Sequence, residues 1–266
     1  MKLPVYNIEG KHSGEIDVGE AFSKPVRVDI INRCFLSEQA ALRQPYGTDP
    51  LAGQRTSAHY HGERGTRYAM MNKEMARGKR IHNQGYLNLT ARFMPHAVKG
   101  RRAHPPKAES IWLQKVNKKE KLAAIISAIS ASSSKSFISS RGHIIPSSIS
   151  HFPIIVDDKV EDVKSTKNLI SFILSMGFRD ELKRVEWKKI RAGRGKCRGR
   201  KYKKKLGPII VVGKIGSILK SVNNIPGFDC VEWNKLTVSM LAPGGQPGRL
   251  AIITKSAVEN LLKLGK

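Results

Sequence analysis

Cysteine is scarce in this sequence: only Cys34, Cys197 and Cys230 occur among its 266 residues. Their spacing forms neither a disulfide framework nor the CxxC pair of a structural zinc site. Long apolar runs are also lacking, because the longest, at 122–131 and 168–176, reach about half the roughly 20 residues of a membrane-spanning helix. The first residues, MKLPVYNIEG, lack the apolar segment of a secretory signal. These absences favour a protein of the reducing cytoplasm with no membrane partner.

Acidic residues are few compared with basic ones. The chain has 48 lysines and arginines against 21 aspartates and glutamates, a formal net charge of +27. A compact chain with this charge repels itself unless a polyanion neutralises it. The imbalance is local: residues 183–205 hold 13 basic residues and one acid, and residues 43–107 hold 13 and three. Two tracts therefore carry the excess charge, and a nucleic acid is the expected partner.

Residues 43–107 have little with which to build a core. Only six of these 65 residues are Val, Ile, Leu or Phe, and glycines and prolines interrupt the segment throughout. A structureless segment of this length is rare inside a compact domain unless it is functional or disordered. Its tyrosines and Phe93 alternate with arginines, a mixture suited to stacking on unpaired bases while neutralising phosphates. A segment ordered by RNA is favoured; a solvated, disordered insert is the alternative.

The remaining sequence, 1–42 and 108–266, predicts a globular α/β domain. Periodicity and turn residues predict a hairpin of 4–8 with 14–18, helices over 24–43, 117–131, 165–178, 217–225 and 255–264, and strands over 153–158, 207–213, 228–233, 236–241 and 250–254. Pro25 is expected at the start of the first helix, and Gly177 as a left-handed cap. Because strands alternate with helices, we expect a mostly parallel sheet layered by helices, with 43–107 inserted as a long extended basic loop after the first helix.

A sheet of this kind could support an enzyme, so two candidate sites need weighing. The segment GKIGS, 213–217, follows an apolar strand as a phosphate loop does, but it lacks the GxxxxGK[ST] and GxGxxG spacings. A tight strand-to-helix turn is the alternative. Asp157 and Asp158 follow another strand, where open α/β sheets bind ligands. Since a helix follows shortly, helix capping or surface exposure is the simpler explanation of these two carboxylates.

Two further patterns have catalytic or metal-binding alternatives. Cys197 lies between Lys196 and Arg198, which favours the thiolate, but no histidine is close in sequence to act as a base. His59 and His61 could share a metal ion. Without a third ligand near them in sequence, they are more typical of loop histidines. Neither pattern predicts a catalytic site, a cofactor or a metal.

Five segments carry a family resemblance: RQPYGTDPLAGQRTSA (43–58), GRRAHPPK (100–107), RAGRGKCRGRKYKKKLGPIIV (191–211), NNIPGFDCV (223–231) and LAPGGQPGRLAIIT (241–254). In this order they resemble the archaeal and eukaryotic form of the large-subunit ribosomal protein four family. The eukaryotic form has a long basic tail after its last helix, so the archaeal form is nearer. The resemblance implies a globular domain on the outer surface of the large subunit, and a loop that threads through rRNA to the wall of the peptide exit tunnel.

The expected RNA-binding residues are basic and aromatic side chains of the two tracts. They are Arg43, Tyr46, Arg55, Arg64, Arg67, Arg77, Lys79, Arg80, Arg92, Arg101, Arg102, Lys107, Arg191, Arg194, Lys196, Arg198, Arg200, Lys201, Tyr202 and Lys203. Arginine pairs bidentately with phosphate and stacks on bases, while glycines between arginines let the backbone approach RNA closely. By the same resemblance, Met70, Met71 and Arg77 are expected to face the tunnel.

The sequence thus predicts a non-catalytic rRNA-binding constituent of the large ribosomal subunit that supports subunit assembly. Its expected partners are large-subunit rRNA, neighbouring large-subunit proteins and the nascent peptide, with no homo-oligomer. An RNA-modifying enzyme with a nucleotide cofactor on the sheet is one alternative. A DNA-compacting protein is another, which accounts for the charge but not for a single long insert with interleaved aromatics.

Overall fold

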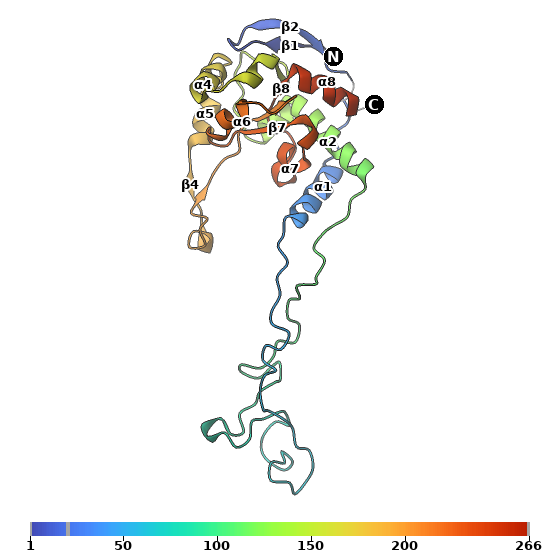
Figure 1. The fold of residues 1–266 in the computed structure, drawn as a ribbon, viewed down its shortest axis with the longest axis vertical. Helices are drawn as coiled ribbons and strands as arrows, with labels where there is room; N and C mark the ends of the chain where they lie inside the picture. The colour runs from blue at the N-terminus through green and yellow to red at the C-terminus, as the bar shows by residue number, and fades with distance from the viewer. Residues whose placement is uncertain (1, 20–21, 265–266) are drawn as a thin grey trace. The chain divides into compact units, whose positions relative to one another are not determined.

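The computed structural model describes residues 2–19 and 22–264, and the chain divides into two compact units (Figure 1). The globular unit comprises the chain up to Leu42 and from Leu113 onwards, and the loop unit comprises Arg43–Trp112. The division falls after Leu42 and after Trp112, whereas the sequence analysis placed the loop at 43–107, which stays a prediction.

A six-stranded sheet forms the centre of the globular unit. Its strand order is β2 (His12–Asp17), β1 (Lys2–Tyr6), β3 (Ile154–Val156), β8 (Ala251–Thr254), β6 (Ile209–Val212) and β7 (Asp229–Glu232). The pair of β1 and β2 is antiparallel, and every other pair is parallel. The predicted mostly parallel sheet is therefore confirmed, including the amino-terminal hairpin at its edge.

Alternation along the strands divides the core into two layers. Val211 and Ile253 point to one face of the sheet, and Ile210 and Ile252 to the other. Helices α1 (Val28–Ala41), α2 (Lys118–Ser133), α7 (Val238–Leu241) and α8 (Lys255–Leu264) cover the first face; α3 (Lys135–Ser140), α4 (Thr166–Ser175) and α6 (Ile218–Asn223) cover the second. Strands that are buried on both faces read as continuous apolar runs, which is why the sequence reveals them.

Two predictions about local structure are wrong, and two helices have no counterpart among the predictions. Residues 236–241 include helix α7 rather than a strand, because the distant carboxylate of Glu38 accepts hydrogen bonds from the backbone N–H groups of Val238 and Ser239 at 3.3 and 2.8 Å. Helix α1 begins at Val28, three residues after Pro25. Helices α3 and α5 (Arg179–Glu186) were not expected, since charged and serine-rich segments hide their periodicity.

The loop unit has little regular structure. A short 3-10 helix spans Gly85–Leu87, and isolated bridges join His59 to Arg80 and Arg80 to Ala91. The outgoing and returning chains run side by side, and Thr48 N–H donates to the carbonyl of Pro106 at 3.1 Å (Figure 1). Its buried residues are few: Ala58, Ala69, Met70, Ile81 and His82.

Candidate RNA-binding surfaces

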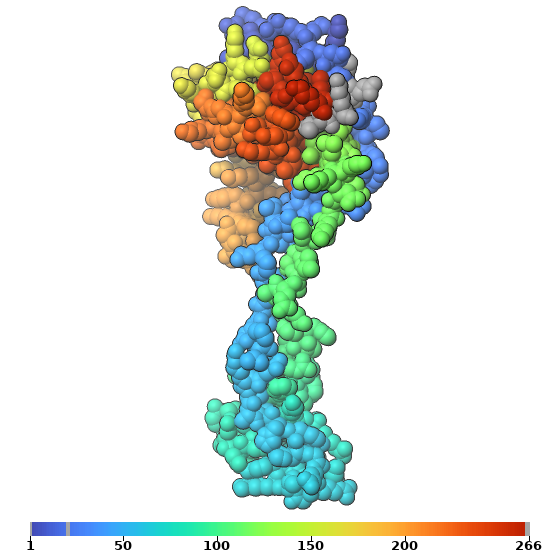
Figure 2. All heavy atoms as spheres, turned by 45° about the vertical axis from the view of Figure 1, so that its right-hand side comes forward, coloured from blue at the N-terminus to red at the C-terminus, as the bar shows by residue number. Residues whose placement is uncertain are grey.

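The basic tract of the globular unit forms a hairpin. Strands β4 (Lys189–Ile190) and β5 (Tyr202–Lys203) pair antiparallel, and a 3-10 turn, Gly193–Gly195, lies at the tip. Gly193 and Gly199 have φ of +73° and +76°, a backbone conformation that side chains with a Cβ rarely adopt. Glycine at these positions therefore permits the backbone conformation of the tip and also lets a binding partner approach the backbone closely. In Figure 2 this segment, in light orange, projects from the rest of the globular unit.

The hairpin presents nearly all of its predicted RNA-binding side chains to solvent. Seven are exposed: Arg194, Lys196, Arg198, Arg200, Lys201, Tyr202 and Lys203. Arg191 is half-buried, because its Nε donates to the carbonyl of Arg200 at 3.0 Å and so fixes the tip. Trp187, which the sequence reasoning missed, is 57% exposed beside Lys205, whose Nζ lies 5.3 Å from the ring centroid. Its position among lysines in EWKKI is the signal that could have identified it.

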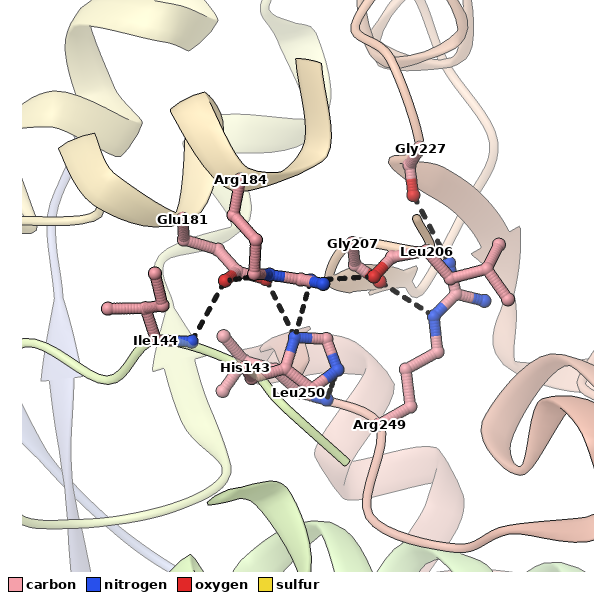
Figure 3. A network of polar contacts seen from close by, with 9 residues as sticks. All are labelled: His143, Ile144, Glu181, Arg184, Leu206, Gly207, Gly227, Arg249 and Leu250. Atoms are coloured by element: carbon pink, nitrogen blue, oxygen red, sulfur yellow. Dashed lines mark hydrogen bonds and ion pairs between the residues drawn. The ribbon is translucent and has the colours of Figure 1, made fainter. Parts of the chain in front are cut away.

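A buried ionic network holds the base of this hairpin (Figure 3). The fully buried carboxylate of Glu181, on α5, accepts hydrogen bonds from Arg184 Nη2 and Nε at 2.6 and 2.7 Å. It also accepts from His143 Nδ1 at 2.7 Å and from the N–H of Ile144 at 2.9 Å. Arg184 in turn donates to the carbonyl of Leu206, at the end of the hairpin, at 2.7 Å. Side chains from two distant segments and the backbone of a third thus fix where the hairpin leaves the body.

Protonation in this network follows from its contacts. Burial would raise the pKa of Glu181, but the hydrogen bonds from Arg184 and His143 outweigh it and lower that pKa to about 2. Burial lowers the pKa of His143 despite its carboxylate partner. A neutral His143 satisfies both ring nitrogens, because Nδ1–H donates to Glu181 while Nε2 accepts from the N–H of Leu250 at 3.3 Å.

Arg249 secures the other side of the hairpin base. Only 1% exposed, it donates to the carbonyls of Gly207 and Met240 at 2.8 and 2.9 Å. Its Nη2 also pairs with the Asp229 carboxylate at 2.5 Å. The guanidinium therefore joins the segment preceding β8 to α7, to β7 and to the residues just before β6, and it is occupied by the protein rather than available to a ligand.

An electropositive cleft of about 470 Å³ opens beside the hairpin base. Arg141, Arg184 and the lysines of 203–205 line it, together with Ser140, Leu206 and the turn residues Pro243, Gln246 and Pro247. Burial and the charges of Arg249 and Arg184 lower the pKa of Arg141 to about 10, which still leaves it charged at neutral pH. Among the residues that the structure describes, no carboxylate lines the cleft, so it suits an anion such as a phosphate group.

The loop unit exposes most of its predicted RNA-binding residues as well. Nine are exposed: Arg43, Tyr46, Arg55, Arg64, Arg67, Arg77, Lys79, Arg102 and Lys107. Arg80, Arg92 and Arg101 are half-buried. Arg80 donates to the carbonyls of Leu89 and Ala76 at 2.8 and 3.1 Å, and Arg92 to that of Val98 at 2.6 Å. These two guanidinium groups hold the loop unit together.

The three residues expected to face the tunnel have different environments. Arg77 is exposed and Met71 half-buried, whereas Met70 is only 1% exposed. Met70 therefore packs inside the loop unit instead of lying at its surface. Its apolar side chain is one of the few that this unit can bury, and its N–H donates to the carbonyl of His61 at 3.3 Å.

Aromatic stacking joins the two ends of the loop unit. The rings of Tyr46 and Trp112 stack with centroids 5.7 Å apart and an interplanar angle of 17°. Arg43 lies over the Trp112 ring at 5.1 Å. The sequence reasoning missed Trp112, because it lies just beyond the expected end of the loop.

The structure brings a third histidine to His59 and His61. The ring of His82 lies 4.8 Å from that of His59 and 5.3 Å from that of His61, centroid to centroid. His82 is 8% exposed, and burial together with the nearby histidines lowers its pKa. A third histidine therefore lies beside the pair in space, although it comes from 21 residues beyond His61 in the chain.

The candidate enzymatic sites have structural roles. The carboxylate of Glu161 accepts from the N–H of Gly213 at 2.8 Å and from that of Lys214 at 3.4 Å, where a phosphate loop would hold a phosphate. Thr254 Oγ1 donates to the same carboxylate at 2.7 Å. Asp158 accepts from the N–H of Ser256 at 2.9 Å and so caps the distant helix α8, not the helix that follows it in the sequence. Cys197 is a free, exposed thiol.

Within 2–19 and 22–264, none of the helices has the length and apolar composition that crossing a bilayer requires.

Residues 16–264 match the model of the Ribosomal protein L4/L1 family. A Nanoarchaeum equitans protein named large ribosomal subunit protein uL4 is 42% identical over 265 residues, covering 98% of this chain and 97% of that protein. Proteins of the same name from Methanocaldococcus jannaschii and Sulfurisphaera tokodaii are 43% and 40% identical; each alignment covers 98% of this chain, and 98% and 94% of those proteins. The chain belongs to the ribosomal protein L4/L1 family.

Proposed function

We propose that this chain is a structural, non-catalytic constituent of the large ribosomal subunit in the cytoplasm and that it binds large-subunit rRNA. The observation that carries the proposal is the hairpin, which exposes a row of lysines and arginines while the charged groups at its base are paired within the protein. The relatives named large ribosomal subunit protein support the assignment to that subunit.

The hairpin suits a phosphate backbone better than a base sequence. Its arginines offer planar forks to phosphates, and its lysines act as point charges. Trp187 and Tyr202 offer exposed rings on which unpaired bases can stack. The cleft at the base, lined by Arg141 and Arg184, can receive a phosphate. Such contacts position a protein on RNA more than they read its sequence.

The loop unit is the second proposed RNA contact. Its exposed arginines and its small buried set of side chains favour a segment that completes its order against rRNA, as the family resemblance implies. We propose that it reaches the peptide exit tunnel, where Arg77 would face the nascent chain. Neighbouring large-subunit proteins are proposed as partners of the globular unit, and no homo-oligomer is expected.

The proposal is tested by replacing Arg191, Arg194, Arg198 and Arg200 together with alanine in the full-length chain. Loss of four phosphate contacts should weaken rRNA binding by about 100-fold or more at 0.1 M salt and reduce the slope of log affinity against log salt by about three. The matched control replaces Lys164, Lys167, Lys214 and Lys220, four exposed lysines elsewhere on the globular unit. Unchanged binding in the arginine variant, or an equal loss in both, contradicts the proposal.

Hydrogen exchange across 43–107 tests the role of the loop unit. We expect fast exchange in the free protein and strong protection in isolated large subunits, because rRNA would supply the contacts that the segment's own side chains do not. Exchange in the globular unit should be slow in both samples. Equal protection of 43–107 in the two samples would show that the segment orders without RNA.

A further inference from the structure

His59, His61 and His82 form a cluster of potential metal ligands inside the loop unit. Taking one ring nitrogen from each, the three atoms all lie within 4.8 Å of one another. Two imidazole nitrogens bound to one tetrahedral zinc ion, at about 2.0 Å each, are roughly 3.3 Å apart. The observed spacing therefore needs only small side-chain rotations to reach that geometry.

The ring of His82 is buried without satisfied polar atoms. Neither Nδ1 nor Nε2 has a partner in hydrogen-bond geometry among the residues that the structure describes. An unsatisfied buried polar group costs roughly 1–3 kcal/mol, and native proteins rarely keep one without a function. At the same time Nε2 of His59 and Nε2 of His61 lie 2.6 Å apart, so one proton is shared by two basic atoms. A ligand that accepts electron pairs would satisfy all three rings.

The backbone holds the three histidines in place. His59 and Arg80 exchange N–H to carbonyl hydrogen bonds at 3.2 and 3.1 Å, which fixes the segment of His59 and His61 against that of His82. The ring of Tyr68 packs over that of His82, with centroids 4.6 Å apart. The cluster is therefore built by pairing of distant segments and is not a chance approach of surface side chains.

We propose that these three imidazoles bind one divalent transition-metal ion of the zinc class. Neutral imidazole is a ligand for zinc, copper and nickel, whereas magnesium and calcium prefer oxygen ligands. The surrounding segment is strongly basic, with 13 lysines and arginines against three acids in 43–107. Long-range charge therefore opposes a dication, and only an ion with strong coordination to imidazole can bind. The exposed side chain of His59 gives the ion a route of entry.

A metal at this position would compensate for the small core of the loop unit. It would join residues 59–61 to residue 82 by coordination, and metal binding to a site absent from the unfolded chain stabilises the fold directly. The inference is independent of the rRNA contacts proposed above, since it needs none of the hairpin residues. Metal binding should therefore persist in the variant that lacks the four hairpin arginines.

The test uses the purified full-length chain, stripped with a chelator and titrated with Zn²⁺ and with Co²⁺. We expect one ion per chain and the ligand-field absorption of tetrahedral Co²⁺, displaced by Zn²⁺ but not by excess Mg²⁺. His59→Gln and His82→Gln should each weaken binding by more than about 100-fold, the upper end of what loss of a merely supporting residue costs. His59 is exposed, so its replacement removes a ligand without disturbing buried packing.

The matched controls are His96→Gln and His104→Gln, two exposed histidines of the loop unit outside the cluster. Both should bind Co²⁺ as the unaltered chain does. Three results would overturn the proposal: no Co²⁺ absorption in the unaltered chain, binding that persists in both His59→Gln and His82→Gln, or an equal loss in the two controls.

Discussion

The globular unit and the loop unit are stabilised by different forces. The first buries two layers of Val, Ile, Leu and Phe against a sheet, whereas the second buries only five residues, of which one is a histidine. In the loop unit, backbone pairing, arginine-to-carbonyl hydrogen bonds and ring stacking replace apolar burial. Where aliphatic side chains are few, polar contacts supply more of the stability, and a bound ligand can add to those contacts.

The two basic tracts differ in the same way. The hairpin is anchored to the globular unit through buried charges, so its exposed arginines extend from a fixed base. The outgoing and returning chains of the loop unit are joined instead by a backbone hydrogen bond from Thr48 to Pro106 and by the stacked rings of Tyr46 and Trp112. Changes in the ionic network should therefore be costly and cooperative, while changes in the loop unit should be smaller and local.

Glu181→Ala should have the largest effect. Removing the carboxylate leaves Arg184 charged and largely buried without its partner, a change that typically costs about 3–5 kcal/mol of unfolding free energy. Urea denaturation followed by circular dichroism measures it. Glu186→Ala, an exposed acid on the same helix, is the control and should cost less than about 0.5 kcal/mol. Similar losses in the two variants would mean that the network does not stabilise the globular unit.

Acidification should act on the same network. The pKa of Glu181 is lowered to about 2, so its contribution is fully present above its unfolded-state pKa and is lost as pH falls towards 2. The lowered pKa of His143 acts in the same direction, because below about pH 6.5 the unfolded state takes up a proton that the folded state resists. Glu181 alone predicts a loss of about 3 kcal/mol between pH 6.5 and 2, and His143 adds to it.

Stability measured against pH distinguishes this network from the other carboxylates. In Glu181→Gln the acidic limb of the curve should be shallower than in the unaltered chain, because the titrating group is gone. Parallel curves for the two proteins would assign the acid sensitivity to other groups. The loop unit contains no buried carboxylate among its described residues, so its hydrogen exchange should change less over this range.

The sheet could be predicted from the sequence because the residues that specify each strand are consecutive. Strands such as IIVV at 209–212 are continuous apolar runs, and Gly177, with φ of +86°, ends its helix as expected. The exposed basic residues were equally predictable, since clusters of lysine and arginine without acids rarely bury. For the sheet and the exposed basic residues, composition and periodicity are sufficient to predict the structure.

The remaining features depend on residues far apart in sequence. Glu38 caps α7 across 200 positions, and His143 meets Glu181 across 38. The third histidine of the cluster reaches the first two only because Arg80 pairs with His59. No pattern of spacing encodes such meetings, because they follow from tertiary packing that overrides local propensity.

Gly53→Ala should have an intermediate effect that is confined to the loop unit. Gly53 has φ of +74°, and an added Cβ would lie 2.7 Å from Cα of Arg101 on the returning chain. Strain and overlap should cost about 2–3 kcal/mol of local protection, measured by hydrogen exchange in 47–54 and 100–106 of isolated large subunits, where this segment is expected to be protected. Gly65→Ala is the control, since Gly65 has φ of +79° but open space around it. Its cost should be about 1 kcal/mol, from backbone strain alone.

If Gly53→Ala and Gly65→Ala lose the same amount of protection, the close approach of Gly53 to Arg101 does not contribute to local stability. A loss of stability in the globular unit as well would show that the two units do not unfold independently. Urea denaturation of the globular sheet, unchanged in Gly53→Ala, excludes that outcome. The two units then differ in local stability within one folded chain.

Tyr46→Ala should have the smallest effect. The stacked pair of Tyr46 and Trp112 is partly exposed, so its loss should cost about 0.5–1.5 kcal/mol and loosen only the ends of the loop unit. Replacing Trp187 and Trp233 with phenylalanine leaves Trp112 as the only tryptophan, whose quenching by acrylamide then reports this contact. Quenching should rise in Tyr46→Ala and stay unchanged in Tyr86→Ala, where the ring is 94% exposed. Equal quenching in both would mean that the ends of the loop unit are held by the Arg43 contact and the backbone, and that stacking contributes little there.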